Sequence, residues 1–557
     1  MQTISIEKHQ HSLSPRRATM ITGVAYGLTA CFLAVMVFEN FLFSSGFDIL
    51  SFREINDVAF HATLKRVHVD LSQGHLDKIF FINDYGYGWA FWFPVALLTY
   101  PLYLINNHFA IAWPLVAAPR QLSLAFGVLT LMVLRKIFLT QRQPEWVAAV
   151  AVLILVLFPT FGYASLHFGT TSQVFFFTIL STYLALQDTP STTKGRMLIA
   201  TALAVAGGVK LTGLLVGPLV FFLVILRYEY TTLKRFLVDF VVVFTVFVFL
   251  LMVFTNPGLL TYPLNNSVAH DYFTTLSHFY EVTKRGDISF AQPFKRFYDI
   301  FFNGMPTLIA LSLLFVGLLA PVLGQGAQRR ELGLITGVTA LIMGYLFLTV
   351  SNGQSGVLYF SAISFVLLLG SIWWSRQRIG IPVLALIPML LFGDMLHNAW
   401  LQHKIDRYSF NHLAYFVIDH KSQAPLDLSE KVSACLDVDT KVWSGHVFID
   451  YRVQTKFNSL SAPNASISVA FNNLAGHRKY YQRPIDFVVT HTKSPGSLPQ
   501  GAFDHMLKTM DPKSASELAD DRQSRLTLAQ GDAFDGRRFK LLCDLGDALV
   551  YAAEGSQ

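Results

Sequence analysis

Charged residues are scarce in this chain. Aspartate, glutamate, lysine and arginine make up 14% of its 557 residues, whereas 53% of the residues are hydrophobic. A soluble globular protein carries roughly 25% charged residues. The composition therefore excludes an ordinary soluble protein and indicates an α-helical polytopic membrane protein.

Cysteine is rare as well, with three in the whole chain, which excludes a disulfide-rich secreted scaffold. Cys31 lies within the first long apolar run, and Cys435 and Cys543 lie in a polar C-terminal region. The last two can pair in a disulfide if that region faces an oxidising compartment. Two separate buried thiols are the alternative.

Other patterns are missing too. The polar segment before the first apolar run is too long for a signal peptide, and no small-residue cleavage site follows that run, so we expect a retained first helix. No internal repeat is visible, so the sequence does not support the inverted repeats of many transporters. The net charge of +7 indicates no nucleic-acid partner, because the basic residues cluster at the ends of apolar runs.

The long apolar runs predict membrane-spanning helices, because a bilayer core of about 30 Å needs roughly 20 apolar residues. The predicted spans are residues 20–43, 116–138, 147–165, 171–187, 197–210, 211–227, 236–255, 303–323, 332–350, 356–374 and 379–398. The basic clusters all fall on one side if the apolar stretch 89–105, interrupted by Pro94 and Pro101, lies at the outer surface. We therefore predict about 11 transmembrane helices, with the N-terminus in the cytoplasm and the C-terminus outside.

This topology predicts the domain organisation. Residues 1–19 form a cytoplasmic N-terminus, residues 20–399 a transmembrane module, and residues 400–557 a soluble periplasmic α/β domain. The module has a first outer loop at 44–115, with surface helices, and a second at 256–302. Strand-like segments separated by Pro and Gly turns support the C-terminal domain, namely KVWSGHVFIDY, DFVVTH and FKLLCDLGDALVYAA.

The first outer loop holds the carboxylate best placed for catalysis. Asp57 opens an amphipathic pattern in which Val58, Phe60, Leu64 and Val67 recur at near-helical spacing. We expect a surface helix that holds Asp57 at its start, near the membrane face. A simple role as a helix cap is the structural alternative.

Further candidates lie in the same loop. Glu54 is a nearby second carboxylate, and Asp84, Tyr85 and Tyr87 belong to the glycine-containing segment FINDYGYGW. These residues are candidates to close a cleft or to contact an acceptor. An interfacial aromatic belt would have the same composition.

Cations and imidazoles near the outer helix ends form another group. Lys210 follows Gly207-Gly208-Val209 at the predicted turn between the spans 197–210 and 211–227. An ammonium inside a bundle is costly unless it has a role, although snorkelling to headgroups would also explain it. Arg120 lies at the outer end of a predicted helix, and an interfacial anchor is its structural alternative. His167 lies in a predicted outer turn, and its structural alternative is an ordinary loop histidine. Asp394 and His397 are expected to be a partly solvated structural pair.

In their order these features resemble the GT-C superfamily of membrane glycosyltransferases, which includes protein O-mannosyltransferases and the lipid A aminoarabinose transferase. The segment NDVAFHATLKRVHVDLSQGHLDKIF is similar to the family's acidic outer loop, with Asn56-Asp57 where many relatives have two acids. Three later segments are similar to family motifs in the same order: PRQLSLAFGVLTLMVLRKIF, FPTFGYASLHFGTTSQVFFFTILSTYLAL and AVAGGVKLTGLLVGPL. The resemblance covers residues 20–230.

The resemblance implies that a sugar moves from a polyprenyl phosphate carrier to a hydroxyl acceptor at the periplasmic face of a bacterial inner membrane. Asp57 would act as the base, and Lys210, Arg120 and His167 would bind the donor phosphate. A glycolipid, lipopolysaccharide and a protein all stay open as acceptors. A divalent cation stays open as a cofactor, but no metal site is predicted because one carboxylate binds a hard cation poorly.

Other classes remain alternatives. A transporter or flippase for lipid-linked glycans would also need ionisable groups in its bundle, but here the acids lie mainly in outer loops. An O-antigen ligase or polymerase would share the lipid-linked donor and would rely on arginines in large outer loops. A structural or sensor protein is a further alternative.

Overall fold

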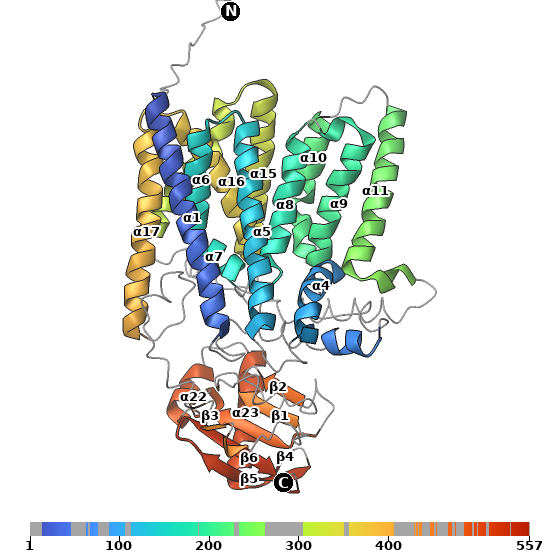
Figure 1. Cartoon of the computed structure of the whole chain (residues 1–557), viewed down its shortest axis with the longest axis vertical. Coiled ribbons are helices and arrows are strands. Elements are labelled where there is room, and N and C mark those ends of the chain that lie inside the picture. Colours follow the sequence, from blue (N-terminus) through green and yellow to red (C-terminus); the bar gives the residue numbers. More distant parts are fainter. Residues whose placement is uncertain are drawn as a thin grey trace, which may run out of the picture. The chain divides into compact units, whose positions relative to one another are not determined.

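The computed structural model of the chain (Figure 1) describes a helical bundle and a C-terminal sheet. In the first 405 residues it describes 14–45, 63–64, 67–75, 88–105, 113–166, 168–187, 189–227, 233–261, 305–349 and 356–405. In the C-terminal region it describes 428, 431–432, 434–436, 446–450, 453, 466–470, 474, 484–492, 495–497, 499–507, 512–534 and 536–555. The chain divides into two compact units, one formed by 1–40, 64–97 and 119–417, and the other by 41–63, 98–118 and 418–557.

The apolar runs of the sequence form helices. The α-helices are α1 (Pro15–Ser45), α4 (Trp89–Ile105), α5 (Trp113–Thr140), α6 (Glu145–Leu157), α7 (Pro159–Leu166), α8 (Thr171–Leu186), α9 (Thr193–Val209), α10 (Gly217–Arg227), α11 (Leu233–Thr255), α14 (Met305–Phe315), α15 (Gly326–Thr349), α16 (Gly356–Ser375) and α17 (Gly380–Ile405). Four 3-10 helices join them: η1 (Thr189–Ser191), η2 (Leu211–Val216), η3 (Pro257–Thr261) and η4 (Val316–Leu323).

Among the described residues, five helical segments are long and apolar enough to cross a bilayer: Pro15–Phe38, Ala117–Thr140, Phe236–Thr255, Met305–Leu323 and Gly380–His397. Five shorter apolar helices accompany them: Trp89–Ile105, Glu145–Leu157, Thr171–Leu186, Leu211–Arg227 and Ala362–Ser375. The membrane class is confirmed. The count of about 11 crossings, which rests on charge placement, stays a prediction, as does the placement of 89–105 at the surface.

Three predicted spans are divided within the described residues. The span 147–165 becomes α6 and α7, because Phe158 precedes Pro159 and adopts extended torsion angles (φ −68°, ψ 132°) that a residue before proline favours. The span 211–227 begins as the 3-10 helix η2 and continues as α10, and the span 303–323 contains α14 followed by the 3-10 helix η4.

The bundle core surrounds α6, in which every residue from Trp146 to Leu157 is buried. By contrast, α11 exposes Phe240, Phe244 and Phe249, and the rings of Phe236, Phe240, Phe244 and Phe247 contact one another in turn along the helix. An apolar surface of this extent is what hydrocarbon chains rather than water would cover.

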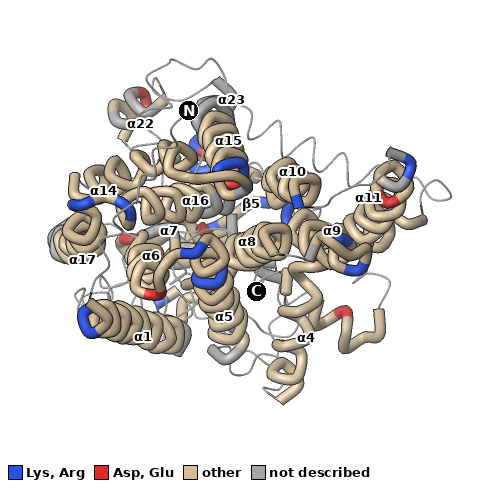
Figure 2. The backbone as a smooth tube through the Cα atoms, turned by 90° about the horizontal axis from the view of Figure 1, so that it is seen from above, with Lys and Arg blue, Asp and Glu red and all other residues tan. Residues whose placement is uncertain are grey.

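Polar contacts join the helices at one end of the bundle, here called the basic end. Arg135 Nε donates to Glu145 Oε1 over 2.6 Å, and Arg227 pairs with buried Glu331 over 2.6 Å. Arg196 pairs with Asp239. These contacts link α5 to α6, α10 to α15 and α9 to α11. Figure 2, seen from this end, shows lysine and arginine at many of the helix ends.

The C-terminal region contains a six-stranded sheet with the order β2-β1-β3-β6-β5-β4. Its strands are β1 (His446–Asp450), β2 (Ser466–Ala470), β3 (Phe487–His491), β4 (Ala533–Phe534), β5 (Arg537–Asp544) and β6 (Ala548–Ala553), accompanied by the helices α22 (Gln500–Leu507), α23 (Pro512–Gln530) and η6 (Pro495–Ser497). Strand β1 runs parallel to β2 and β3, while β6 runs antiparallel to β3 and β5. Both faces are apolar at β1, since Val447 and Ile449 join one core and Phe448 joins another, as is usual for a central parallel strand.

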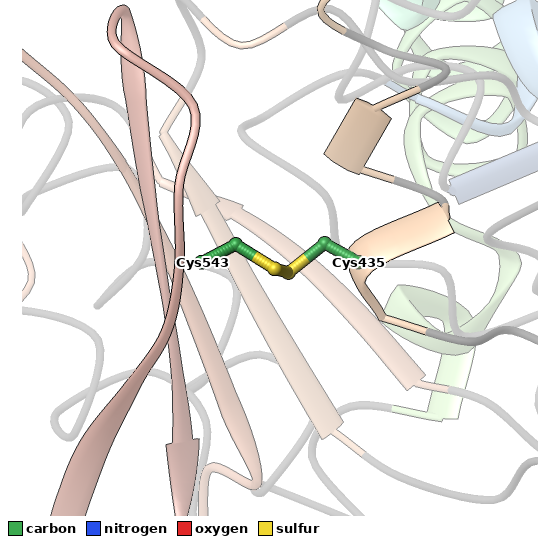
Figure 3. The surroundings of a disulfide bond; sticks show 2 residues. All are labelled: Cys435 and Cys543. Atoms are coloured by element: carbon green, nitrogen blue, oxygen red, sulfur yellow. A yellow bond between two sulfur atoms is a disulfide. The ribbon is translucent and has the colours of Figure 1, made fainter.

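Cys435 and Cys543 form a disulfide in this region (Figure 3). Of the two alternatives for these cysteines, the structure therefore has the disulfide. It joins the segment before β1 to the strand β5. Cys31 is a free, exposed thiol of α1.

Candidate functional site

Lys210 lies at the turn between α9 and η2. Thr192 caps the start of α9, where its side chain accepts from Gly195 N over 3.0 Å, and the helix ends at Val209. Lys210 is extended (φ −157°, ψ 130°), and its carbonyl accepts from Gly213 N over 2.8 Å. The predicted turn is confirmed. Lys210 N also donates to Ala206 O over 3.2 Å, so two backbone bonds fix the position from which the half-buried lysine side chain starts.

Gly88 contacts this turn through its backbone. Its N–H donates to Val209 O over 3.3 Å. A Cβ at Gly88 would overlap Gly208 O and lie 2.8 Å from Phe254 O, and a Cβ at Gly208 would lie 2.8 Å from the Phe254 carbonyl carbon. Three backbone segments therefore meet where only glycine leaves enough room.

The residues that follow Gly88 contact a second turn. Phe91 stacks on Phe168 with 5.5 Å between ring centroids, and Trp92 meets Phe168 edge to face at 6.3 Å. Phe168 lies between α7 and α8. Aromatic pairs of this kind contribute about 1 kcal/mol each beyond the area they bury, so the start of α4 is held against the α7–α8 turn.

The contacts close into a ring, because α8 also packs against η2, and α11 packs against α9. We call this ring the Gly88 junction and define it by Gly88–Trp92, Phe168, Gly208–Lys210 and Phe254. The helix directions place it at the end of the bundle opposite the basic end, since α9 and α11 both start at the basic end. Residues 88–92, in the middle of the first predicted outer loop, therefore lie against the lysine turn.

Arg120 lies near the start of α5 and is 3% exposed. The neighbouring Gln121 donates to Val37 O over 3.0 Å, which fixes this part of α5 against α1. A guanidinium buried in a bundle is expensive. Arg120 lies near the start of α5, whereas Arg135 of the basic end lies near its end. Arg120, like Lys210, is therefore far from the basic end.

Several predicted site residues lie outside the described residues. They are Glu54, Asp57, Asp84, Tyr85, Tyr87 and His167. Their assigned roles therefore stay predictions. Described residues adjoin some of them in the sequence, since Gly88 follows Tyr87 and Phe168 follows His167.

His68 is a buried residue of the first outer loop that the sequence analysis did not select. It lies beside Val67, which is buried together with Leu64, as the amphipathic pattern predicted. Burial lowers the pKa of His68 to about 4, so the imidazole is neutral at physiological pH. The sequence feature that could have indicated this burial is the position of His68 directly after Val67, an apolar residue of the amphipathic pattern.

Asp394 differs from its expected environment. It is 1% exposed rather than partly solvated, because Thr307 at the start of α14 donates a hydrogen bond to it from across the α14–α17 contact. The hydrogen bond joins two helices, which agrees with a structural role. His397, on the same helix, is exposed as expected.

The described residues contain no group of three His, Cys, Asp or Glu side chains close enough to hold a metal ion. Lys210 and Arg120 are cations that the structure describes far from the basic end. This arrangement suits an anionic group such as a phosphate better than a second cation.

A solved structure has the same fold over nearly the whole length. ArnT from Cupriavidus metallidurans in the apo state aligns with a TM-score of 0.52 and 12% sequence identity, over 95% of this chain and 98% of that chain. The predicted fold, a polytopic helical module followed by a C-terminal α/β domain, is thereby confirmed. The sequence matches no protein-family model and no curated protein.

Proposed function

We propose that this protein is a membrane glycosyltransferase that moves a sugar from a polyprenyl phosphate donor to a hydroxyl acceptor. The observation that carries the proposal is the position of Lys210, on a turn that contacts Phe254 and Gly88, a residue of the first outer loop. The GT-C fold agrees with it.

The cations have a definite task in this reaction. When the bond between the anomeric carbon and the phosphate oxygen breaks, the polyprenyl phosphate leaves with an additional negative charge. Cations fixed before the reaction stabilise that charge without reorganising. Lys210 and Arg120 fill this role, with His167 as a further phosphate ligand.

The acceptor side needs a base. Asp57 takes the proton of the acceptor hydroxyl while its oxygen attacks the anomeric carbon, and the polyprenyl phosphate departs from the opposite face, with inversion. Glu54, Asp84, Tyr85 and Tyr87 contact the acceptor or close the site over it. The acceptor is a glycolipid, lipopolysaccharide or a protein.

Two observations support a periplasmic site in a bacterial inner membrane. Basic residues gather at one end of the bundle, which is the cytoplasmic end by the positive-inside rule. The disulfide between Cys435 and Cys543 forms readily in an oxidising compartment and rarely in the cytosol. The Gly88 junction, opposite the basic end, then faces the periplasm.

The test is turnover by the purified protein with synthetic polyprenyl phosphate sugars and candidate acceptors. We expect Asp57→Asn to reduce turnover at least about a hundredfold, which is the lower range for loss of a general base. Asp70→Asn is the matched control, because Asp70 is an acid of the same loop to which the proposed mechanism gives no role. Unchanged turnover in Asp57→Asn would remove Asp57 from the mechanism.

The same assay separates the rival classes. A flippase would move intact lipid-linked sugar across vesicles of the purified protein and release no polyprenyl phosphate. A ligase or polymerase would transfer oligosaccharides and leave single sugars on the carrier. Release of polyprenyl phosphate from a single-sugar donor would support the proposal against both.

A further inference from the structure

Two buried polar side chains adjoin the Gly88 junction and accept no hydrogen bond within the described part of the chain. Gln173, in the first turn of α8, is 3% exposed, and Thr255, the last residue of α11, is 4% exposed. The side-chain oxygens of both, Gln173 Oε1 and Thr255 Oγ1, are buried without a partner. Thr255 directly follows Phe254, and Gln173 lies one turn beyond Phe168.

Other hydroxyl residues of the bundle show the usual solution. Ser172 donates to Ala164 O over 2.6 Å, and Thr130 and Thr201 each donate to the carbonyl four residues earlier in their helices. Serine and threonine commonly satisfy themselves this way in membrane helices. Thr255 does not, and the amide of Gln173 has no such local solution.

A buried polar atom without a partner costs free energy and calls for an explanation. Both atoms belong to helix ends that the ring of contacts joins, through α8 with η2 and α11 with α9. Both residues therefore belong to elements that pack around the turn carrying Lys210. The position of Gln173 and Thr255 and their unpartnered oxygens both favour a ligand that carries hydrogen-bonding groups.

We propose that Gln173 and Thr255 bind the sugar hydroxyls of the donor. A hydroxyl can donate to Gln173 Oε1 and accept from Thr255 Oγ1, whereas an ionised phosphate oxygen only accepts. The amide oxygen thus selects the sugar, and Lys210 selects the phosphate. This inference rests on the proposed function and divides its donor site into two parts.

The experiment compares two ligands, polyprenyl phosphate alone and polyprenyl phosphate carrying a hexose or pentose, in equilibrium binding to the full-length protein in nanodiscs. We expect Gln173→Leu and Thr255→Val each to weaken binding of the preferred sugar-linked ligand about tenfold, the scale of one hydrogen bond. Both variants should bind polyprenyl phosphate as the wild type does. Lys210→Met should weaken both ligands.

Thr336→Val is the matched control. The Oγ1 atom of Thr336 also lacks a partner among the described residues, but Thr336 belongs to α15, which packs on α16, η4 and α10. We expect this variant to bind both ligands normally. Thermal unfolding is measured alongside, and Gln173→Leu should not lose stability, because it removes an unsatisfied polar group. A purely structural glutamine would show the opposite.

The outcomes separate the two proposals. Wild-type protein that binds both ligands, with Gln173→Leu and Thr255→Val unchanged toward the sugar-linked ligand, overturns this inference and leaves the phosphate site intact. Equal weakening toward both ligands also overturns it. Wild-type protein that binds neither ligand overturns the proposed function, and this inference with it.

Discussion

At the scale of the residue, charge was the informative signal in the sequence. Lys210 stood out because a cation inside an apolar run is expensive, and the structure places it at a fixed turn. Gln173 gave no such signal, because an uncharged amide in TTSQ looks like any polar helix start. That Gln173 Oε1 is buried without a hydrogen-bond partner follows only from the three-dimensional structure.

His68 gives a prediction at the same scale. Its pKa is about 4 in the folded protein and about 6.5 in an unfolded chain. Because the folded pKa is the lower one, the unfolded state binds a proton first as the pH falls. The free energy of unfolding should therefore be constant above about pH 7 and decrease below 6.5, by about 2 kcal/mol at pH 5.

Thermal or denaturant unfolding in detergent between pH 7.5 and 5 measures this slope. His68→Gln should flatten the slope, since the substituted side chain does not titrate in this range. His75→Gln is the control, because His75 is a more exposed histidine of the same segment, and it should keep the slope. A wild-type slope that His68→Gln leaves in place would contradict the assignment.

At the scale of the element, hydropathy located the helices, because a bilayer demands about 20 apolar residues per crossing whatever the neighbours are. It did not resolve how helices break. The division at Phe158 follows from Pro159, which is readable locally, but the 3-10 helix η2 depends on Gly213 packing against Ala206, where a Cβ would lie 2.6 Å from the Ala206 oxygen. Such contacts follow from tertiary packing.

The close backbone contact at Gly88 leads to a prediction about how α4 packs on the bundle. Because a Cβ at Gly88 would overlap the backbone of Gly208, Gly88→Ala must move α4 away from the α9–η2 turn. Overpacking of this kind costs roughly 1–3 kcal/mol. We expect a lower unfolding temperature and weaker donor binding, measured by thermal unfolding and by the binding assay above.

Gly27→Ala is the matched control. Gly27 lies inside α1, where a Cβ would meet nothing within 4 Å, and alanine has a higher helix propensity than glycine. The control should unfold at or slightly above the wild-type temperature. If Gly88→Ala unfolds as Gly27→Ala does, then the close contact at the Gly88 junction is not present in the protein.

At the scale of the whole molecule, the sequence predicted the classes of the two parts but not the sheet topology. The strand-like segments KVWSGHVFIDY, DFVVTH and FKLLCDLGDALVYAA contain β1, β3, β6 and all but the first two residues of β5. None of these segments contains β2, although β2 pairs with β1 along its whole length. Strand order depends on pairings between distant segments, which no local pattern records.

The disulfide is the feature of the C-terminal unit that also reports on the compartment. Cys435 and Cys543 are 108 residues apart, and closing a loop of that length stabilises a fold by up to about 5 kcal/mol in the chain-entropy model. Cys435→Ser in the full-length protein should therefore expose the C-terminal unit to proteolysis at lower temperature. Cys31→Ser, which removes the free thiol of α1, should not.

Thiol labelling of the full-length protein tests the pairing directly. A bulky maleimide added after denaturation without reductant should modify Cys31 alone, and prior reduction should add two further modifications, at Cys435 and Cys543. The disulfide should form when the protein is made in bacteria with an oxidising periplasm and fail in a strain that lacks periplasmic thiol oxidation, because the cytosol keeps thiols reduced. Three modified cysteines in the unreduced protein would place the C-terminal unit in a reducing compartment, and the basic end of the bundle could then no longer be taken as the cytoplasmic one.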